Sequence, residues 1–211
     1  MSCRYINGNR KQMRFSIIMP SRLANYNGAA RYRDQKIIRA IKSVLDQSFQ
    51  DFELIVIADG CNETKTIVTN EFTGERLKLV EVKHRALFDN SPRNKGISEA
   101  QGEYIVYLDN DDYWGEDHLA IINHNLNGYN WIWYNDYIWD GQWIERACNV
   151  RQMGACGTSN ICHNKELNLY WERPGYAHDY HFVQKLLRIP NHTKIETPEY
   201  FVMHIPGKYD L

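Results

Sequence analysis

Residues 104–112 read YIVYLDNDD, an apolar strand pattern that ends in three carboxylates within four positions. Unpaired carboxylates this close together repel one another, so such a cluster indicates a bound cation. If the backbone stays extended, Asp109 and Asp111 point to the same side while Asp112 begins the next turn. The pattern therefore favours a hard divalent metal at the end of a buried strand. The alternative is an acidic turn that caps a helix beginning near Glu116.

Short apolar runs alternate with helical patterns on both sides of this stretch, over residues 15–125. Strands separated by helices pair in parallel through right-handed crossovers, so the predicted fold class is α/β, a mostly parallel open sheet with helices on both faces. The predicted strands are residues 15–19, 52–58, 77–82 and 103–108, and the predicted helices are 37–45, 64–72 and 91–100. In the third helix, Ser91 is the expected N-cap and Pro92 the first helical residue.

Polar groups follow three of the predicted strands. The first strand ends in Pro20, Ser21 and Arg22, the second in Asp59, and the fourth in the acidic residues 109–112. Open α/β sheets bind their ligands at the carboxyl ends of the strands, so these groups should line one crevice. No Gly-rich phosphate loop follows the first strand. A metal and side chains would therefore have to balance the charge of a bound diphosphate.

Composition narrows the choice of partners. The chain has 211 residues, of which 43% are hydrophobic, and a formal net charge of -1, which predicts one domain and gives no electrostatic reason to expect nucleic acid. Basic residues do gather early in the chain, and they would suit peripheral contact with an anionic membrane surface or, equally, a solvated face. They are Arg10, Lys11, Arg14, Arg22, Arg31, Arg33, Lys36, Arg39 and Lys42. No pattern indicates an oligomeric state.

The N-terminal sequence and the cysteines give the expected cellular compartment. Residues 1–14 are polar and basic without an apolar core, and no later run is long enough to span a bilayer, so a soluble, cytoplasmic protein is expected. Without any C-x-x-C pair, the cysteines are expected to be free thiols. The five cysteines are Cys3, Cys61, Cys148, Cys156 and Cys162.

The second half of the chain begins with an aromatic run. Asp140-Gly141 between alternating segments is a hairpin signal. The aromatic side chains would serve as half-buried sheet packing, which is favoured, or would stack on sugar rings. They are Tyr129, Trp131, Trp133, Tyr134, Tyr137, Trp139 and Trp143. Further elements are predicted as helices at 165–170 and 179–188 and a strand at 200–204.

Four segments in this order resemble the family 2 glycosyltransferases, which use the GT-A form of the nucleotide-binding α/β sheet. The matching segments are SIIMPS at 16–21, AIKSVLDQSFQDFELIVIADG at 40–60, PRNKGI at 92–97 and GEYIVYLDNDD at 102–112. The resemblance implies a donor half at residues 1–128, which binds a nucleotide-sugar, and an acceptor half at 129–211 with a small β-hairpin. It also implies that Asp59 contacts the nucleotide base, that Asp109 lies near the ribose and metal, and that Asp111 ligates Mn²⁺ or Mg²⁺.

The resemblance further implies the reaction: transfer of one sugar, from UDP as the favoured nucleotide, to a hydroxyl of a glycan, lipid-linked or other acceptor. The family often has Asp where Ala58 stands and Ser where Cys61 stands, which leaves the base preference less defined. The Gln-x-x-Arg-Trp motif of processive members is absent. In the family the base that deprotonates the acceptor is an acidic residue opening a helix in the second half. Asp179 matches that place and implies inversion at the anomeric carbon; an ordinary helix N-terminal charge is the alternative.

Several further residues are candidates for the donor site. His204, near the end of the chain, matches a histidine that ligates metal in many GT-A enzymes, and Lys208 after it could reach a phosphate. Arg93 could offset phosphate charge, and Asn94 could hydrogen-bond the ligand or the loop of Asp109. Asn110 is grouped with these donor-binding residues. The polar run Thr158, Ser159 and Asn160 would suit acceptor or donor hydroxyls, or form a plain polar loop.

Other functions compete with this interpretation. The Asp109-x-Asp111 pattern also fits a phosphatase of the haloacid dehalogenase type, although that family places it on an early strand, and a nucleotidyltransferase, although the expected Gly- and Arg-rich loop is missing. A non-catalytic carbohydrate-binding module would use the aromatic hairpin for stacking. A zinc site would draw on a set of residues whose spacing fits no common pattern. That set is Cys156, Cys162, His163, His178 and His181.

Overall fold

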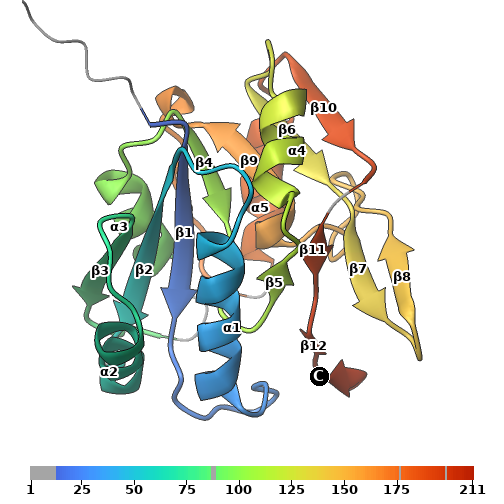
Figure 1. Cartoon of the computed structure of the whole chain (residues 1–211). Helices are drawn as coiled ribbons and strands as arrows, with labels where there is room; N and C mark the ends of the chain where they lie inside the picture. The colour runs from blue at the N-terminus through green and yellow to red at the C-terminus, as the bar shows by residue number, and fades with distance from the viewer. Residues whose placement is uncertain (1–12, 87–88, 176, 198) are drawn as a thin grey trace, which may run out of the picture.

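The computed structural model describes residues 13–86, 89–175, 177–197 and 199–211, and its centre is a seven-stranded sheet (Figure 1). The strand order is β10-β6-β9-β4-β1-β2-β3, in which β9 runs antiparallel to both neighbours and the other pairs are parallel. The strands are β1 Phe15–Ser21, β2 Phe52–Asp59, β3 Leu77–Val82, β4 Tyr104–Tyr107, β6 Trp131–Tyr134, β9 Ile161–Asn164 and β10 His192–Ile195. The predicted α/β class is therefore confirmed.

Helices cover both faces of this sheet, because side chains alternate between its two sides. Ile17 and Met19 of β1 pack with helices α1, α2 and α4, whereas Ile18 packs with α3 and α5. The helices are α1 Arg33–Leu45, α2 Asn62–Glu71, α3 Ser91–Glu99, α4 His118–Asn125 and α5 His178–Leu186, with short 3₁₀ turns at Thr158–Asn160 and Lys165–Leu167. Each face thus has its own apolar core.

A second, smaller sheet lies beside the first, in the order β5-β11-β7-β8, and a terminal hairpin follows it. The expected hairpin at Asp140-Gly141 is present: Trp139 pairs with Trp143, and Gly141 adopts the left-handed φ of 74° that such a turn requires. The strands are β5 Tyr113–Trp114, β7 Asp136–Trp139, β8 Trp143–Arg146, β11 Tyr200–Phe201, β12 His204–Ile205 and β13 Tyr209–Asp210.

Some predicted boundaries were wrong, each for a local reason. Strand β1 continues through Pro20, because β4 pairs with β1 only as far as Ile18 and leaves that side of β1 without a partner strand. The helix expected at 165–170 is a single 3₁₀ turn, since Asn168 is left-handed with φ 51°. The helix at Ser91 has Asn90 as its N-cap, so Pro92 is its second residue.

The strand expected at 200–204 is split, because β11 pairs with β5 and β7 whereas β12 pairs with β13. Between these two strands, the Met203 amide is held by the Asp112 carboxylate. The chain therefore turns from the small sheet to the terminal hairpin at this point.

Two further expectations from the sequence concern the state of the cysteines and the presence of membrane-spanning segments. Cys61, Cys148, Cys156 and Cys162 are free thiols as predicted, while Cys3 lies outside the described residues, as do Arg10 and Lys11. None of the helices in the described ranges combines the length and apolar character needed to cross a bilayer.

His118 is a buried histidine with no hydrogen-bond partner for its Nε2 among the described residues. Its ring stacks on Trp114 at 4.4 Å and meets the Tyr134 ring edge-on at 4.9 Å. Burial lowers the pKa of His118 from 6.5 to about 3, because this aromatic site cannot solvate an imidazolium ion. The ring is therefore neutral in the folded protein.

We predict that His118 makes the fold acid-sensitive. Its folded pKa is lower than its unfolded value, so between these two values the unfolded chain binds a proton that the folded chain does not. The stabilisation is complete above pH 6.5 and is lost as the pH falls towards 3. Replacing His118 with Phe should reduce the slope of unfolding free energy against pH by about 1.4 kcal/mol per unit between pH 6 and 4, measured by urea titration. The exposed His124→Gln control should keep the slope, and an unchanged slope in His118→Phe would contradict this prediction.

Candidate functional site

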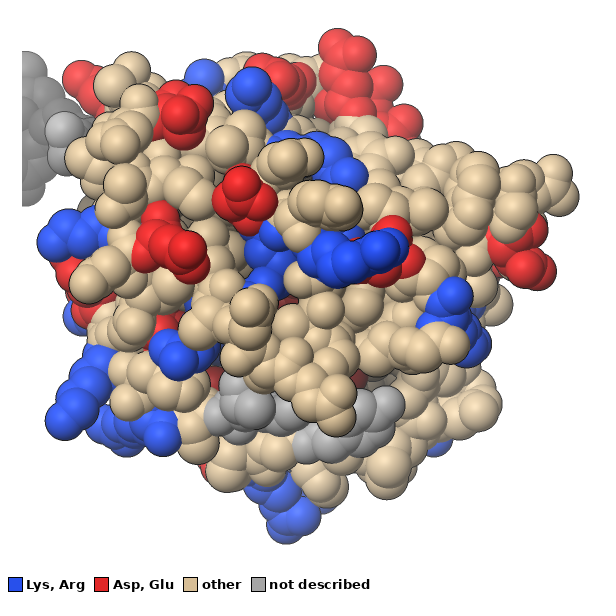
Figure 2. Space-filling model, turned by 90° about the horizontal axis from the view of Figure 1, so that it is seen from below, with Lys and Arg blue, Asp and Glu red and all other residues tan. Residues whose placement is uncertain are grey.

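The carboxyl ends of β1, β2 and β4 meet on the lower side of the sheet in Figure 1. Asn110 Nδ2 donates to Ser21 Oγ at 2.9 Å, and Ser21 Oγ also lies 2.8 Å from Thr64 Oγ1. Arg22 Nη1 donates to the Asp59 carbonyl at 3.1 Å. These contacts bring together the polar groups that follow β1, β2 and β4. We call the region formed by residues 20–22, Asp59 and residues 109–112 the donor edge. Seen from this side in Figure 2, acidic and basic side chains are interspersed, and neither sign forms a broad patch.

Asp59 is held in one orientation at the end of β2. Its Oδ2 lies 2.8 Å from His84 Nδ1, and its Oδ1 is buried without a hydrogen-bond partner among the described residues. A buried carboxylate oxygen without a donor costs free energy unless a ligand supplies one. Sequence reasoning missed His84, although it follows β3 just as Asp59 ends β2, so the same strand-end rule could have found it.

The acidic segment is a tight turn, so the expectation of extended backbone with Asp109 and Asp111 on one side was wrong. The Asp112 amide donates to the Asp109 carbonyl at 3.3 Å, which closes the turn. The physical reason is that β4 ends at Tyr107, after which no ladder holds the chain straight. Each carboxylate consequently has a different environment.

Asp109 and Asp112 have partners within the protein. Asp109 Oδ1 accepts a hydrogen bond from Arg93 Nη2 at 3.2 Å. Asp112 is buried and accepts hydrogen bonds from the Tyr200 hydroxyl and from the Met203 amide, the latter at 2.8 Å. Burial and the neighbouring aspartates raise the pKa of Asp112, and these two hydrogen bonds oppose the rise. Asp112 is therefore a structural group that holds the C-terminal segment against the acidic turn.

Asp111 differs from both. No other described residue donates a hydrogen bond to its side chain, and Arg39 binds only its backbone carbonyl, at 3.0 Å. Burial and the Asp109 charge raise the pKa of Asp111 to about 6, against the opposing effects of His204 and Lys36. Sequence reasoning also missed Tyr26, whose pKa is raised by burial and by the nearby charge of Asp111. A carboxylate in this position would be stabilised by a cation.

The donor types at this edge suit a hard divalent ion, but no group of three acidic, cysteine or histidine side chains in the described ranges is close enough together to hold a metal. The same finding applies to the zinc set considered from the sequence, which forms no cluster of three among the described residues.

His204 lies beside the loop that follows β1. Its Nε2 is 2.9 Å from the Gly28 carbonyl oxygen, which can only accept, so this nitrogen carries the proton. Its Nδ1 faces Asp210 Oδ1 at 3.3 Å without hydrogen-bond geometry. Lys208 lies in the exposed turn between β12 and β13, and the structure shows no contact of its side chain with the other candidate residues.

Arg93 and Asn94 on α3 have different roles. The Arg93 guanidinium lies over the Trp171 ring at 5.4 Å, and its buried Nε has no partner among the described residues. Asn94 does not bond the loop of Asp109, as had been considered. Its amide donates to the Trp171 carbonyl at 2.8 Å and accepts from the Trp171 amide at 2.8 Å, because Trp171 runs directly alongside α3. Both ends of Asn94 are thus occupied by backbone.

The polar run Thr158 to Asn160 is buried, so the expected role in binding ligand hydroxyls does not fit it. Ser159 Oγ accepts a hydrogen bond from the Asp109 amide at 3.0 Å, and Thr158 Oγ1 lies 3.4 Å from His178 Nε2. The run therefore joins the acidic turn to the N-terminus of α5. Asp179 lies in the first turn of that helix, where its Oδ1 accepts from the Tyr180 amide at 2.7 Å.

This chain is similar to known proteins over much of its length. The model of glycosyl transferase family 2 matches residues 16–130, which include β1, β2, the acidic turn and α3. The chain belongs to glycosyl transferase family 2.

Individual members of the family are longer than the part they share with this chain. The UDP-Glc:alpha-D-GlcNAc-diphosphoundecaprenol beta-1,3-glucosyltransferase WfgD of Escherichia coli is 34% identical over 106 residues, which are 50% of this chain and 38% of WfgD. S. aureus TarS 1-349, solved with UDP-GlcNAc, superposes with a TM-score of 0.73 at 18% identity and covers 93% of this chain and 60% of its own. The mannosyltransferase PcManGT of Pyrobaculum calidifontis, solved with GDP-Man and Mn²⁺, gives 0.64 at 16% identity and covers 94% and 59%. These structures share the GT-A fold with this chain.

The buried link between Asp112 and Tyr200 should contribute measurably to stability. Replacing Tyr200 with Phe leaves one oxygen of Asp112 buried without its donor, so the free energy of unfolding should fall by about 1–3 kcal/mol. The matched control is Tyr129→Phe, at a residue that is 36% exposed. Chemical denaturation of both variants tests this, and equal stabilities would show that the Tyr200 hydroxyl does not support the acidic turn.

Proposed function

We propose that this chain is a metal-dependent, inverting family 2 glycosyltransferase that moves one sugar from a UDP-sugar to a hydroxyl of a glycan, lipid-linked or other acceptor. The observation that carries the proposal is that Asp59 Oδ1 and the Asp111 carboxylate, both at the donor edge, have no donor from another described residue. Residues 1–128 would bind the donor and residues 129–211 the acceptor.

Nucleotide binding would use the ends of β1 and β2. Asp59 Oδ1, which has no hydrogen-bond partner among the residues that the structure describes, would accept a base N–H, such as the imide of uracil, while His84 keeps the carboxylate in place. Pro20, Ser21, Arg22 and Asn110 surround this point and would contact the ribose or the phosphates. UDP is favoured because a similar fold was solved with UDP-GlcNAc and a relative is named for UDP-Glc.

The metal would be held by Asp111 and Asp109, with His204 as a third candidate ligand. Mg²⁺ at nucleotide sites is bound by one or two carboxylates together with substrate phosphates, so a complete protein cage is not required. A bound Mn²⁺ or Mg²⁺ would act as a Lewis acid on the departing diphosphate. Arg93, whose Nε has no partner in the described part of the chain, and Lys208 would add positive charge near the same group.

The acceptor hydroxyl must lose its proton as it attacks, and Asp179 is the proposed base. Thr158 and Ser159 connect the start of α5, which carries Asp179, to the Asp109 amide, and this connection supports the proposal. Direct attack by a hydroxyl from the face opposite the diphosphate inverts the anomeric carbon.

The rival functions fit less well. Sugar binding by the aromatic sheet would need open ring faces, but Tyr113 stacks on Phe201 at 4.7 Å and Tyr137 stacks on Phe201 at 5.0 Å, so these rings cover each other. These stacked rings are therefore better explained as packing within the small sheet than as the sugar-binding surface of a carbohydrate-binding module. A phosphatase or nucleotidyltransferase reading of Asp109-x-Asp111 has no support beyond that motif.

Removal of the Asp111 carboxylate should abolish metal-dependent nucleotide binding. In calorimetry, UDP should bind the unmodified chain in the presence of Mn²⁺ and lose at least about tenfold in affinity when EDTA replaces the metal. Asp111→Ala should show the weak binding with or without Mn²⁺, whereas Asp140→Ala, in an exposed hairpin turn, should bind normally. Tight UDP binding by Asp111→Ala would refute the metal assignment.

Asp179→Asn should separate binding from chemistry. Because the amide cannot accept the proton, turnover should fall by about 10²–10⁴-fold while UDP affinity with Mn²⁺ stays unchanged. The exposed Glu166→Gln variant serves as the charge-matched control. Turnover would be measured with a panel of UDP-sugars by release of UDP. Normal turnover in Asp179→Asn would mean that another group is the base.

A further inference from the structure

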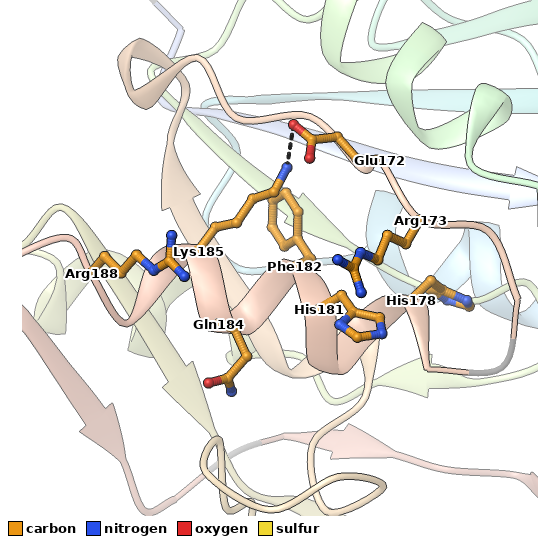
Figure 3. A pocket seen from close by; sticks show the side chains of 8 residues that line it. All are labelled: Glu172, Arg173, His178, His181, Phe182, Gln184, Lys185 and Arg188. Atoms are coloured by element: carbon orange, nitrogen blue, oxygen red, sulfur yellow. Dashed lines mark ion pairs between the residues drawn. The ribbon is translucent and has the colours of Figure 1, made fainter.

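A cavity of about 250 Å³ runs along α5, outside the donor edge, and Figure 3 shows the side chains that line it. They come from α5, from Arg188 two residues beyond its end, and from the segment that precedes it, at residues 172–173. Pockets for whole drug-sized ligands measure roughly 300–1,000 Å³. This cavity therefore suits one small group of a ligand rather than an entire nucleotide-sugar.

The charged side chains of the lining are mainly cationic. Arg173 and Arg188 make no side-chain hydrogen bond or ion pair with any residue in the described part of the chain, and they lie toward opposite ends of the row drawn in Figure 3. Lys185 between them pairs with Glu172 at 2.7 Å and donates to the Tyr170 carbonyl at 2.9 Å. Three cationic side chains thus face one carboxylate, and His181 adds ring N–H capacity.

The floor of the cavity connects it to the donor edge. Phe182 is buried and stacks on Trp171, with ring centroids 4.0 Å apart and 7° between the planes. The Arg93 guanidinium also lies over the Trp171 ring, and it pairs in turn with Asp109. The cavity is therefore separated from the acidic turn by one rigid aromatic stack.

Asp179 lies at the end of α5 nearest the donor edge, and Lys185 lies six residues further along the helix. At 1.5 Å per residue this separation is roughly 9 Å along the axis. His178, next to Asp179 at the start of α5, also lines the cavity, and its Nε2 lies 3.4 Å from Thr158 Oγ1, beside the Ser159 hydroxyl that accepts a hydrogen bond from the Asp109 amide. A hydroxyl placed at Asp179 can thus belong to a molecule whose anionic group lies in the cavity.

We propose that the α5 cavity binds the phosphate or diphosphate group of the acceptor, through Arg173, Lys185, Arg188 and His181. The proposal rests on the proposed function, because it takes Asp179 as the place where the acceptor hydroxyl reacts. Guanidinium groups bind phosphate oxygens in a planar, bidentate manner, and two of them without side-chain partners among the described residues form a site for such an anion. The same chemistry is presented by a soluble sugar phosphate and by a lipid-linked sugar diphosphate.

The first experiment titrates the protein with sodium pyrophosphate in buffer free of divalent metal, followed by calorimetry. One site should appear, and Arg173→Gln combined with Arg188→Gln should weaken it by roughly tenfold per arginine. The control is Arg76→Gln, whose side chain lies over Phe52 at the amino end of β2 and which should bind normally. No binding to the unmodified protein, or equal binding by the double variant, would overturn the proposal.

Two further measurements separate this site from the donor site. Asp111→Ala should bind pyrophosphate normally, and the double arginine variant should bind UDP with Mn²⁺ as tightly as the unmodified protein. Pyrophosphate binding that depends on Asp111 would place the anion at the donor edge and overturn the proposal. If UDP fails to bind the unmodified protein, the proposed function is wrong. The pyrophosphate titration still tests whether the α5 cavity binds an anion.

The source of the anion is tested with two probes, glucose 1-phosphate and neutral phosphatidylcholine vesicles that carry a polyprenyl diphosphate. If the vesicles retain the unmodified protein but not the double variant, the acceptor is lipid-linked. If the double variant loses only its binding to glucose 1-phosphate, the acceptor is soluble. If neither probe distinguishes the double variant from the unmodified protein, the cavity does not serve an acceptor phosphate.

Discussion

The parallel pairing of β1 with β2 on one side and with β4 on the other determines where the donor-edge residues lie. In a parallel sheet the strands end at the same edge, so Ser21, Asp59 and the acidic turn are neighbours although they are far apart in the sequence. The hydrogen bonds from Asn110 to Ser21 and from Arg22 to the Asp59 carbonyl then fix the spacing of this edge. If β1 left the sheet, these groups would separate.

The turn after β4 gives each of its three carboxylates a different environment, which limits the repulsion among them. Asp112 is buried but doubly hydrogen-bonded, and Asp109 is paired with Arg93. Asp111 receives no hydrogen bond from another described residue, and burial together with the Asp109 charge raises its pKa although His204 and Lys36 oppose the rise. One acidic side chain of the turn is thus left without a direct donor among the described residues, which is an arrangement suited to a cation that arrives with its substrate.

Trp171 occupies the boundary between the two proposed sites. Its backbone is bound at both ends by Asn94, one face of its ring packs on Phe182, and the Arg93 guanidinium lies over the ring. The indole N–H also donates to the Tyr107 hydroxyl at 3.2 Å. With so many contacts this side chain is rigid, so it can hold α5 and its cationic cavity at a constant distance from the acidic turn.

The sequence by itself determined the α/β class, the order of the strands and helices from β1 to β4, and the candidates Asp59, Asp109 and Asp111, because hydrophobic periodicity and strand ends are local properties. The tertiary structure alone decided which groups these residues meet. His84 on Asp59, Tyr200 on Asp112 and Trp171 on Asn94 are contacts between segments 25 to 88 positions apart. No local pattern encodes such pairs, since they arise only when packing brings separate segments together.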